Sequence, residues 1–84
     1  MYWVSMTDKC MSGWGKAEHK TDKLVIECTT YEEAEIVEDN ARHRDEMKHI
    51  NICSNKPRYN PRHYQVDYHD KNDYSSWFKK GYFR

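Results

Sequence analysis

Apolar and polar side chains alternate along four short stretches of the chain, which is the period-two pattern of strands that bury one face. These stretches span residues 2–6, 23–28, 49–54 and 64–69. Residues 9–22, between the first two stretches, are mostly polar and hold two of the three glycines. A segment of that length and composition is typical of a long loop. The pattern therefore predicts four strands and one extended connection.

A single long helix is predicted between the second and third stretches. Thr30 and Glu33 have the spacing of a capping box, in which the Thr30 hydroxyl bonds the Glu33 amide and the Glu33 carboxylate returns to Thr30. The helix should then run to about Met47, because apolar residues recur at helical spacing up to that point. Its apolar half consists of Ala34, Ile36, Val37, Ala41 and Met47. Asn40 and Arg44 interrupt this half and are expected at its border.

Residues 74–84 hold five aromatic side chains, which is too much apolar surface to remain free in water. We expect this tail to dock onto the sheet, with one helical turn at residues 75–79. The order strand, strand, helix, strand, strand predicts one α+β domain over residues 1–84, in two layers, with a mixed sheet of about four strands and one main helix. The strands flanking the helix should be parallel, with space for the N-terminal strand between them. The sheet face away from the helix, with Trp3 and Val25, is either covered by the tail or open to a partner.

The composition narrows the classes of function. Leu, Ile, Val and Phe contribute only 11 of the 84 residues, so the seven Tyr and three Trp must supply much of the core. A domain this small has little interior left for a catalytic pocket, so we expect no enzyme activity, catalytic residue or cofactor. The three Cys and five His lack the spacing of metal ligands. No apolar run could span a bilayer, so no membrane partner is expected.

Opposite charges are separated along a chain whose net charge is zero. Residues 24–47 carry two basic and eight acidic side chains, whereas residues 48–84 carry eight basic and three acidic ones. The folded protein could therefore present one acidic and one basic surface. Alternatively, the two blocks neutralise each other across the fold.

Trp14, flanked by Gly13 and Gly15, is the first candidate for partner binding. Large aromatic side chains usually pack in a core, and the glycines would then only let the loop turn. In the alternative, the loop presents Trp14 to a partner protein, since tryptophan is enriched at binding hot spots. The acidic side of the helix is the second candidate, because it could meet a basic protein surface. Its residues are Glu32, Glu35, Glu38, Asp39 and Glu46.

A segment near the fourth strand favours a different partner, a single-stranded nucleic acid. Cationic and aromatic side chains alternate there, and such mixtures combine phosphate contacts with base stacking. They are Lys56, Arg58, Tyr59, Arg62 and Tyr64. A chain without net positive charge lacks the usual electrostatic attraction to nucleic acid, so this function is the alternative rather than the main prediction.

About half of the chain resembles small proteins carried by bacteriophages and prophages. The resemblance is carried by residues 6–9 (MTDK), 11–15 (MSGWG), 24–28 (LVIEC), 31–34 (YEEA), 40–42 (NAR) and 47–48 (MK). Phage proteins of this kind include anti-CRISPR and other anti-defence inhibitors, which act by covering a functional surface of a host protein. The resemblance thus implies an inhibitor in the cytoplasm of a bacterial host, bound to a CRISPR effector subunit or nuclease. It carries over no functional residues, and the sequence leaves open the oligomeric state, a dimer included.

Overall fold

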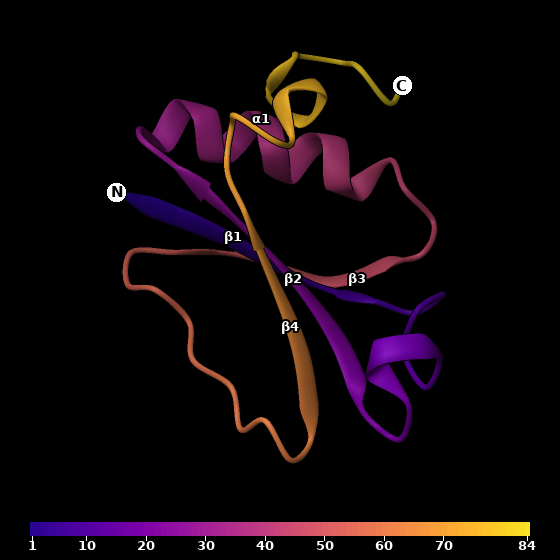
Figure 1. Cartoon of the computed structure of the whole chain (residues 1–84). Coiled ribbons are helices and arrows are strands. Elements are labelled where there is room, and N and C mark those ends of the chain that lie inside the picture. The colour runs from indigo at the N-terminus through magenta and orange to yellow at the C-terminus, as the bar shows by residue number, and fades with distance from the viewer.

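Four strands form one mixed sheet in the order β3-β1-β2-β4, with one main helix packed against it (Figure 1). The computed structural model describes residues 1–84. The elements are β1 (Tyr2–Asp8), β2 (Thr21–Cys28), α1 (Tyr31–Arg42), β3 (Met47–Cys53) and β4 (Tyr64–His69), with short 3-10 turns η1 (Gly15–Ala17) and η2 (Ser75–Phe78). No helix of the structure is both long and apolar enough to cross a bilayer.

The strand pairing confirms the predicted α+β architecture. β1 is antiparallel to both β2 and β3, so the two strands that flank α1 are parallel to each other and separated by the N-terminal strand. β4 adds to the other side of β2 as a parallel edge strand. The predicted long loop between β1 and β2 is also present, and it contains η1.

Helix α1 begins as predicted and ends earlier. The Thr30 Oγ1 atom accepts a hydrogen bond from the Glu33 N–H at 3.2 Å, and the Glu33 carboxylate accepts one from the Thr29 N–H at 2.8 Å, one residue before the predicted donor. The prediction that the helix continues to Met47 is wrong, because Met47 already pairs with Asp8 as the first residue of β3. Pairing with β1 overrides the helical periodicity of this segment.

The core lies between α1 and one face of the sheet. Its buried members are Val4, Met6, Leu24, Ile26, Cys28, Ala34, Val37, Ala41, Met47 and Trp77. Asn40 was predicted at the border of the helix, but it is 0% exposed. Its Nδ2 atom donates to the backbone carbonyls of Trp77 at 2.8 Å and Lys79 at 2.9 Å. The tail therefore docks on the helix side of the sheet, where a buried amide holds it.

The opposite face of the sheet is partly covered by residues 54–63 rather than by the tail. The Tyr68 hydroxyl donates to the Pro57 carbonyl at 2.9 Å, and the Lys56 ammonium lies 4.6 Å from the centre of the Tyr68 ring. Beneath this connection Val25 is completely buried. In Figure 1 the connection runs along the lower left of the sheet, while α1 and the tail lie together at the top.

Candidate functional site

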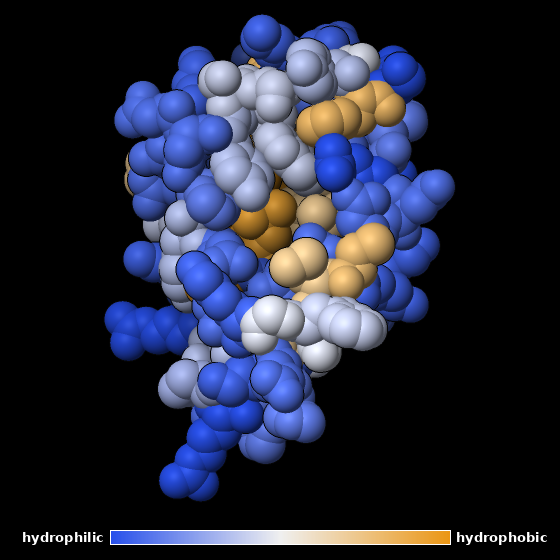
Figure 2. Space-filling view, turned by 45° about the vertical axis from the view of Figure 1, so that its right-hand side comes forward, coloured by the Kyte–Doolittle hydropathy of each residue, from blue (hydrophilic) through white to orange (hydrophobic).

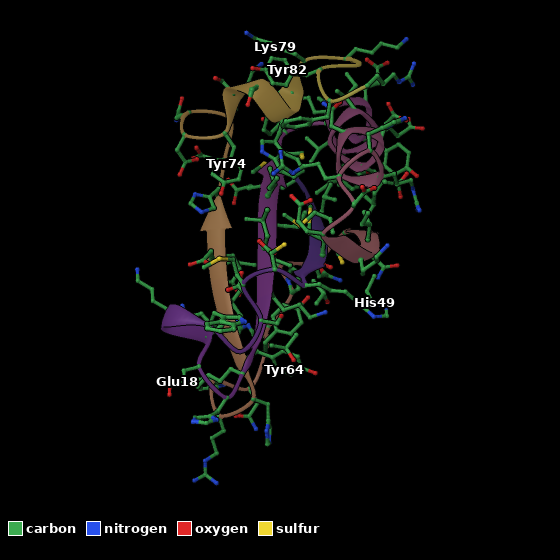
Figure 3. The ribbon with its side chains drawn as sticks, turned by 90° about the vertical axis from the view of Figure 1, so that its right-hand side faces the viewer. Glu18, His49, Tyr64, Tyr74, Lys79 and Tyr82 are labelled. Carbon is green, nitrogen blue, oxygen red and sulfur yellow. The ribbon has the colours of Figure 1, made fainter.

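The largest cavity of the protein, about 530 Å³, opens where β1 ends and β2 begins. Its volume falls in the range of about 300–1,000 Å³ that is usual for ligand sites. It is lined by Asp8, Met11, Trp14, Gly15, Lys16, Ala17, Asp22, Leu24, Arg44, Met47, Asp67, Tyr74 and Trp77. Figure 2 shows a hollow with hydrophobic side chains at its bottom and paler and polar residues around it. In Figure 3 the loop that carries Glu18 lies near the lower ends of the strands, and Tyr74 lies just beyond the upper end of β4.

Three aspartates from three strands line this cavity. Asp8 and Asp22 are register partners in β1 and β2, and Asp67 of β4 lies beside Leu24, two residues further along β2. The Asp8 carboxylate already has hydrogen-bond partners, because its Oδ1 atom accepts hydrogen bonds from the backbone N–H groups of Cys10 and Met11. The sheet therefore brings together three carboxylates that are far apart in the sequence.

Asp22 has the most unusual environment of the three. The residue is only 6% exposed, and no ion pair and no basic side chain stabilises its carboxylate. Burial raises the pKa of Asp22 to about 6, and the negative charges of Asp67 and Asp8 add to the increase. The Asp67 carboxyl group lies close to Asp22 and so favours the protonated form of the Asp22 carboxyl group.

Arg44, one of the two cationic residues that line the cavity, is already engaged by other groups of the chain. Arg44 donates from Nε to the Glu46 carboxylate at 2.7 Å. Its guanidinium carbon lies 5.3 Å from the Trp77 ring centre and 4.7 Å from that of Phe83. Arg44 thus binds a carboxylate and two aromatic rings, and it leaves Asp22 without a counter-ion.

Trp14 lies at the rim of the cavity and is 72% exposed. Its loop is nevertheless fixed by hydrogen bonds. The Gly13 N–H donates to the Ala17 and Lys20 carbonyls, and the Ala17 N–H donates to the Trp14 carbonyl. Gly13 and Gly15 both have positive φ angles, 83° and 55°, which side chains of L-residues rarely adopt. Of the two predicted positions for Trp14, the structure shows the exposed one.

The acidic side of α1 is partly neutralised by the chain itself. Glu32 and Glu35 are exposed, whereas Glu38 pairs with Arg42 at 3.4 Å. Asp39 pairs with Arg84 of the tail at 2.9 Å. The acidic and basic blocks of the sequence therefore meet in part, as one of the two alternatives predicted. Glu46 is bound to Arg44 at the cavity, away from this cluster.

Trp14 and the acidic side of α1 do not form one surface. Figure 1 places the loop with η1 at the lower right and α1 at the top. The predicted partner-binding residues thus belong to two separate regions, and only Trp14 and the Arg44 partner Glu46 lie near the cavity.

The basic-aromatic segment forms a cluster on the other face of the sheet. The Tyr59 and Tyr64 ring centres are 5.2 Å apart, and the Lys23 ammonium lies within 6 Å of both. Arg58 and Arg62 are exposed and form no ion pair with any carboxylate of the chain. These two arginines are therefore free to meet an anionic partner.

The three aspartates of the cavity were not among the residues predicted from the sequence. Asp22 precedes Leu24 and Ile26 in the alternation of β2 and shares their inward face. The period-two pattern of β2 therefore already places a carboxylate at an inward position, where a charged group is unusual because its burial is costly. The partners of Asp22 could not be found in this way, because they depend on which strands become neighbours.

The structure contains no metal-binding arrangement of three or more His, Cys, Asp or Glu side chains. The cysteines are all free. Burial raises the pKa of the Cys28 thiol to about 12, helped by the charges of Glu33 and Glu27, so this thiol stays protonated and unreactive at neutral pH.

Comparisons with known proteins assign no family to this chain. A scan against protein-family models, a search of curated proteins and a search of solved structures each found no match. The features that bear on function are therefore those of the molecule itself: an acidic cavity, an exposed tryptophan at its rim and a separate basic-aromatic cluster.

Proposed function

We propose that this protein is a binding module that attaches to a partner protein through Trp14 and the cavity beside it. The observation that carries the proposal is the position of Trp14, which is 72% exposed on a loop held by backbone hydrogen bonds. A fixed loop loses little conformational freedom on binding, so the burial of the indole contributes almost fully to affinity. Tryptophan side chains in such positions are the residues on which interfaces most often depend.

The chemistry of the cavity favours binding over turnover. Its lining offers carboxylates, aromatic rings, aliphatic groups and the cationic side chains of Lys16 and Arg44, and it includes no Ser, Cys or His side chain. A nucleophile with an adjacent base is the usual requirement for covalent catalysis. A stoichiometric interaction does not require such a pair.

The nature of the partner is proposed from the resemblance of residues 6–48 to phage proteins. We propose a host defence protein, such as a CRISPR effector subunit or nuclease, in the bacterial cytoplasm. Expression of the chain should restore plating of a phage that the host's CRISPR system targets, and Trp14→Ala should abolish the restoration. Unchanged plating efficiency with the wild-type chain contradicts this choice of partner.

Trp14→Ala is expected to weaken partner binding by about 2 kcal/mol or more, which is about thirtyfold in Kd. The affinity-tagged protein is used to retain its partner from a bacterial lysate, and the Kd of the retained protein is then measured. Tyr82→Ala is the matched control, because Tyr82 is 54% exposed and lies in the tail, far from the Glu18 loop (Figure 3). Equal affinity of the two variants would contradict the proposal, as would the absence of a stoichiometric partner.

Nucleic-acid binding is the second candidate function, and the unpaired Arg58 and Arg62 beside Tyr59 and Tyr64 favour it. If it is correct, a fluorescent single-stranded oligonucleotide will bind with an affinity that falls steeply with salt. Each of Arg58→Ala and Arg62→Ala should reduce the slope of log affinity against log salt by about 1. Lys80→Ala, an exposed cation of the tail, is the control. No change of fluorescence polarisation at low salt excludes this function.

A further inference from the structure

We propose that the cavity is a pocket for one basic side chain, an arginine or a lysine, of the partner protein. The cationic group would lie against Asp22 and Asp67, and the aliphatic stem would pass between Trp14 and the inner wall. This inference rests on the proposed function and specifies what the partner inserts beside Trp14. Three observations support it.

The first observation is a buried carboxylate that lacks a cationic partner. Asp22 is more than nine-tenths buried and lines the cavity, yet no cation and no basic side chain of the chain reaches its carboxylate. The charged groups around it are Asp8 from β1 and Asp67 from β4, and both repel a negative charge there. A buried charge is ordinarily paired with an opposite charge. A cation that entered the cavity would supply the counter-ion that the Asp22 carboxylate lacks.

The second observation concerns the cavity walls, which are suited to a cation on an aliphatic stem. Trp14, Tyr74 and Trp77 line the cavity together with Leu24 and Met47. Aromatic faces attract cations, and apolar walls bury the methylene groups of arginine and lysine. Arg44 shows the same combination within the chain, since its guanidinium lies over Trp77 and Phe83 and pairs with Glu46.

The third observation distinguishes an organic cation from a metal ion. No three ligating side chains converge closely enough to hold a metal. The cavity of about 530 Å³ is far larger than an ion, and it is wide enough for a complete side chain. A basic side chain on a partner also brings the neighbouring surface of that partner against the exposed Trp14, so one contact explains both features.

Binding of a cation should depend on pH. Between about pH 4 and 6 the Asp22 carboxyl group holds a proton, which a cation must displace. The other titratable or charged groups at the cavity are Asp8, Tyr74, Lys16 and Arg44. Burial and nearby carboxylates raise the pKa of Tyr74, so the phenol stays neutral in this range. Affinity should therefore rise as the pH increases from about 5 to 7.

The test uses the full chain and three blocked tripeptides, Gly-Arg-Gly, Gly-Lys-Gly and Gly-citrulline-Gly. Binding is followed by two-dimensional NMR, which resolves the backbone amides of Asp22 and Asp67. We expect the arginine or lysine peptide to shift these amides and to bind at least about tenfold more tightly than the neutral citrulline peptide. Asp22→Asn should reduce that binding by about tenfold or more, and Glu35→Gln, on the acidic side of α1, should leave it unchanged.

The outcomes separate this inference from the proposed function. Equal binding of the citrulline peptide, no binding of either basic peptide, or unchanged binding by Asp22→Asn overturns the cation pocket. If Asp22→Asn captures the partner as well as the wild type while Trp14→Ala does not, the cation pocket fails and the proposed function stands. Loss of capture in both variants supports both. Unfolding curves of Asp22→Asn confirm that any loss of binding occurs in a folded protein.

Discussion

Asn40→Ala is expected to lower the free energy of unfolding by about 2 kcal/mol and to release the C-terminal tail. The substitution removes two hydrogen bonds, because the buried Asn40 amide donates to the carbonyls of Trp77 and Lys79. It leaves both carbonyls without that donor and opens a small cavity in the core. The Asn40 Oδ1 atom has no partner in the wild type, so its removal offsets part of the loss.

Urea unfolding at neutral pH measures this change, and the tryptophan fluorescence of the protein, to which the buried Trp77 contributes, reports on the tail. Trp77 is buried against the core, so its emission should shift to longer wavelength when the tail undocks. Asn72→Ala is the control, since Asn72 is exposed and its side chain makes no hydrogen bond within the chain. A stability equal to that of the wild type would show that the tail is held by apolar contacts alone.

Asp22→Asn is expected to stabilise the protein above about pH 6, by about 1–3 kcal/mol. The pKa of Asp22 is about 6 in the folded protein and 3.8 in the unfolded chain. Between these values the folded protein holds a proton that the unfolded chain has released. The ionisation of Asp22 therefore destabilises the folded protein increasingly as the pH rises through this window. The full destabilisation is reached above about pH 6. Asparagine resembles the neutral carboxyl group and avoids that cost.

Thermal unfolding of the wild type and the variant between about pH 4 and 8 provides the measurement. The difference in Tm should be largest at about pH 8 and should vanish near about pH 4, where Asp22 is protonated. Asp45→Asn is the control, because Asp45 is exposed and forms no ion pair. A constant difference at every pH would contradict the proposed cause, since a pure packing effect does not titrate.

The two expected effects of Asp22→Asn point in opposite directions, and observing both would identify the cavity as a binding site. The substitution is expected to strengthen folding and to weaken the binding of a basic side chain. Retaining a buried, unpaired carboxylate costs stability, and binding sites are the usual places where such costs are found. A variant that gained stability without losing binding would indicate that the cavity serves only as packing.

Local patterns in the sequence were enough to predict the elements and their order. The strands follow from period-two alternation, and the start of α1 follows from the spacing of Thr30 and Glu33. The parallel arrangement of β2 and β3 follows from the crossover through a helix. All of these depend on contacts between near neighbours or on the handedness of the chain, which any sequence of this pattern shares.

The remaining features depended on which segments become neighbours in space. The helix ends at Arg42 because Met47 pairs with β1, and Asn40 is buried because the tail supplies two carbonyls to it. The cavity exists because the sheet order places β4 beside β2 and so brings Asp67 to Asp22. Alternation along one strand determines which face a residue occupies, but only strand pairing and the docking of the tail determine what that residue meets there.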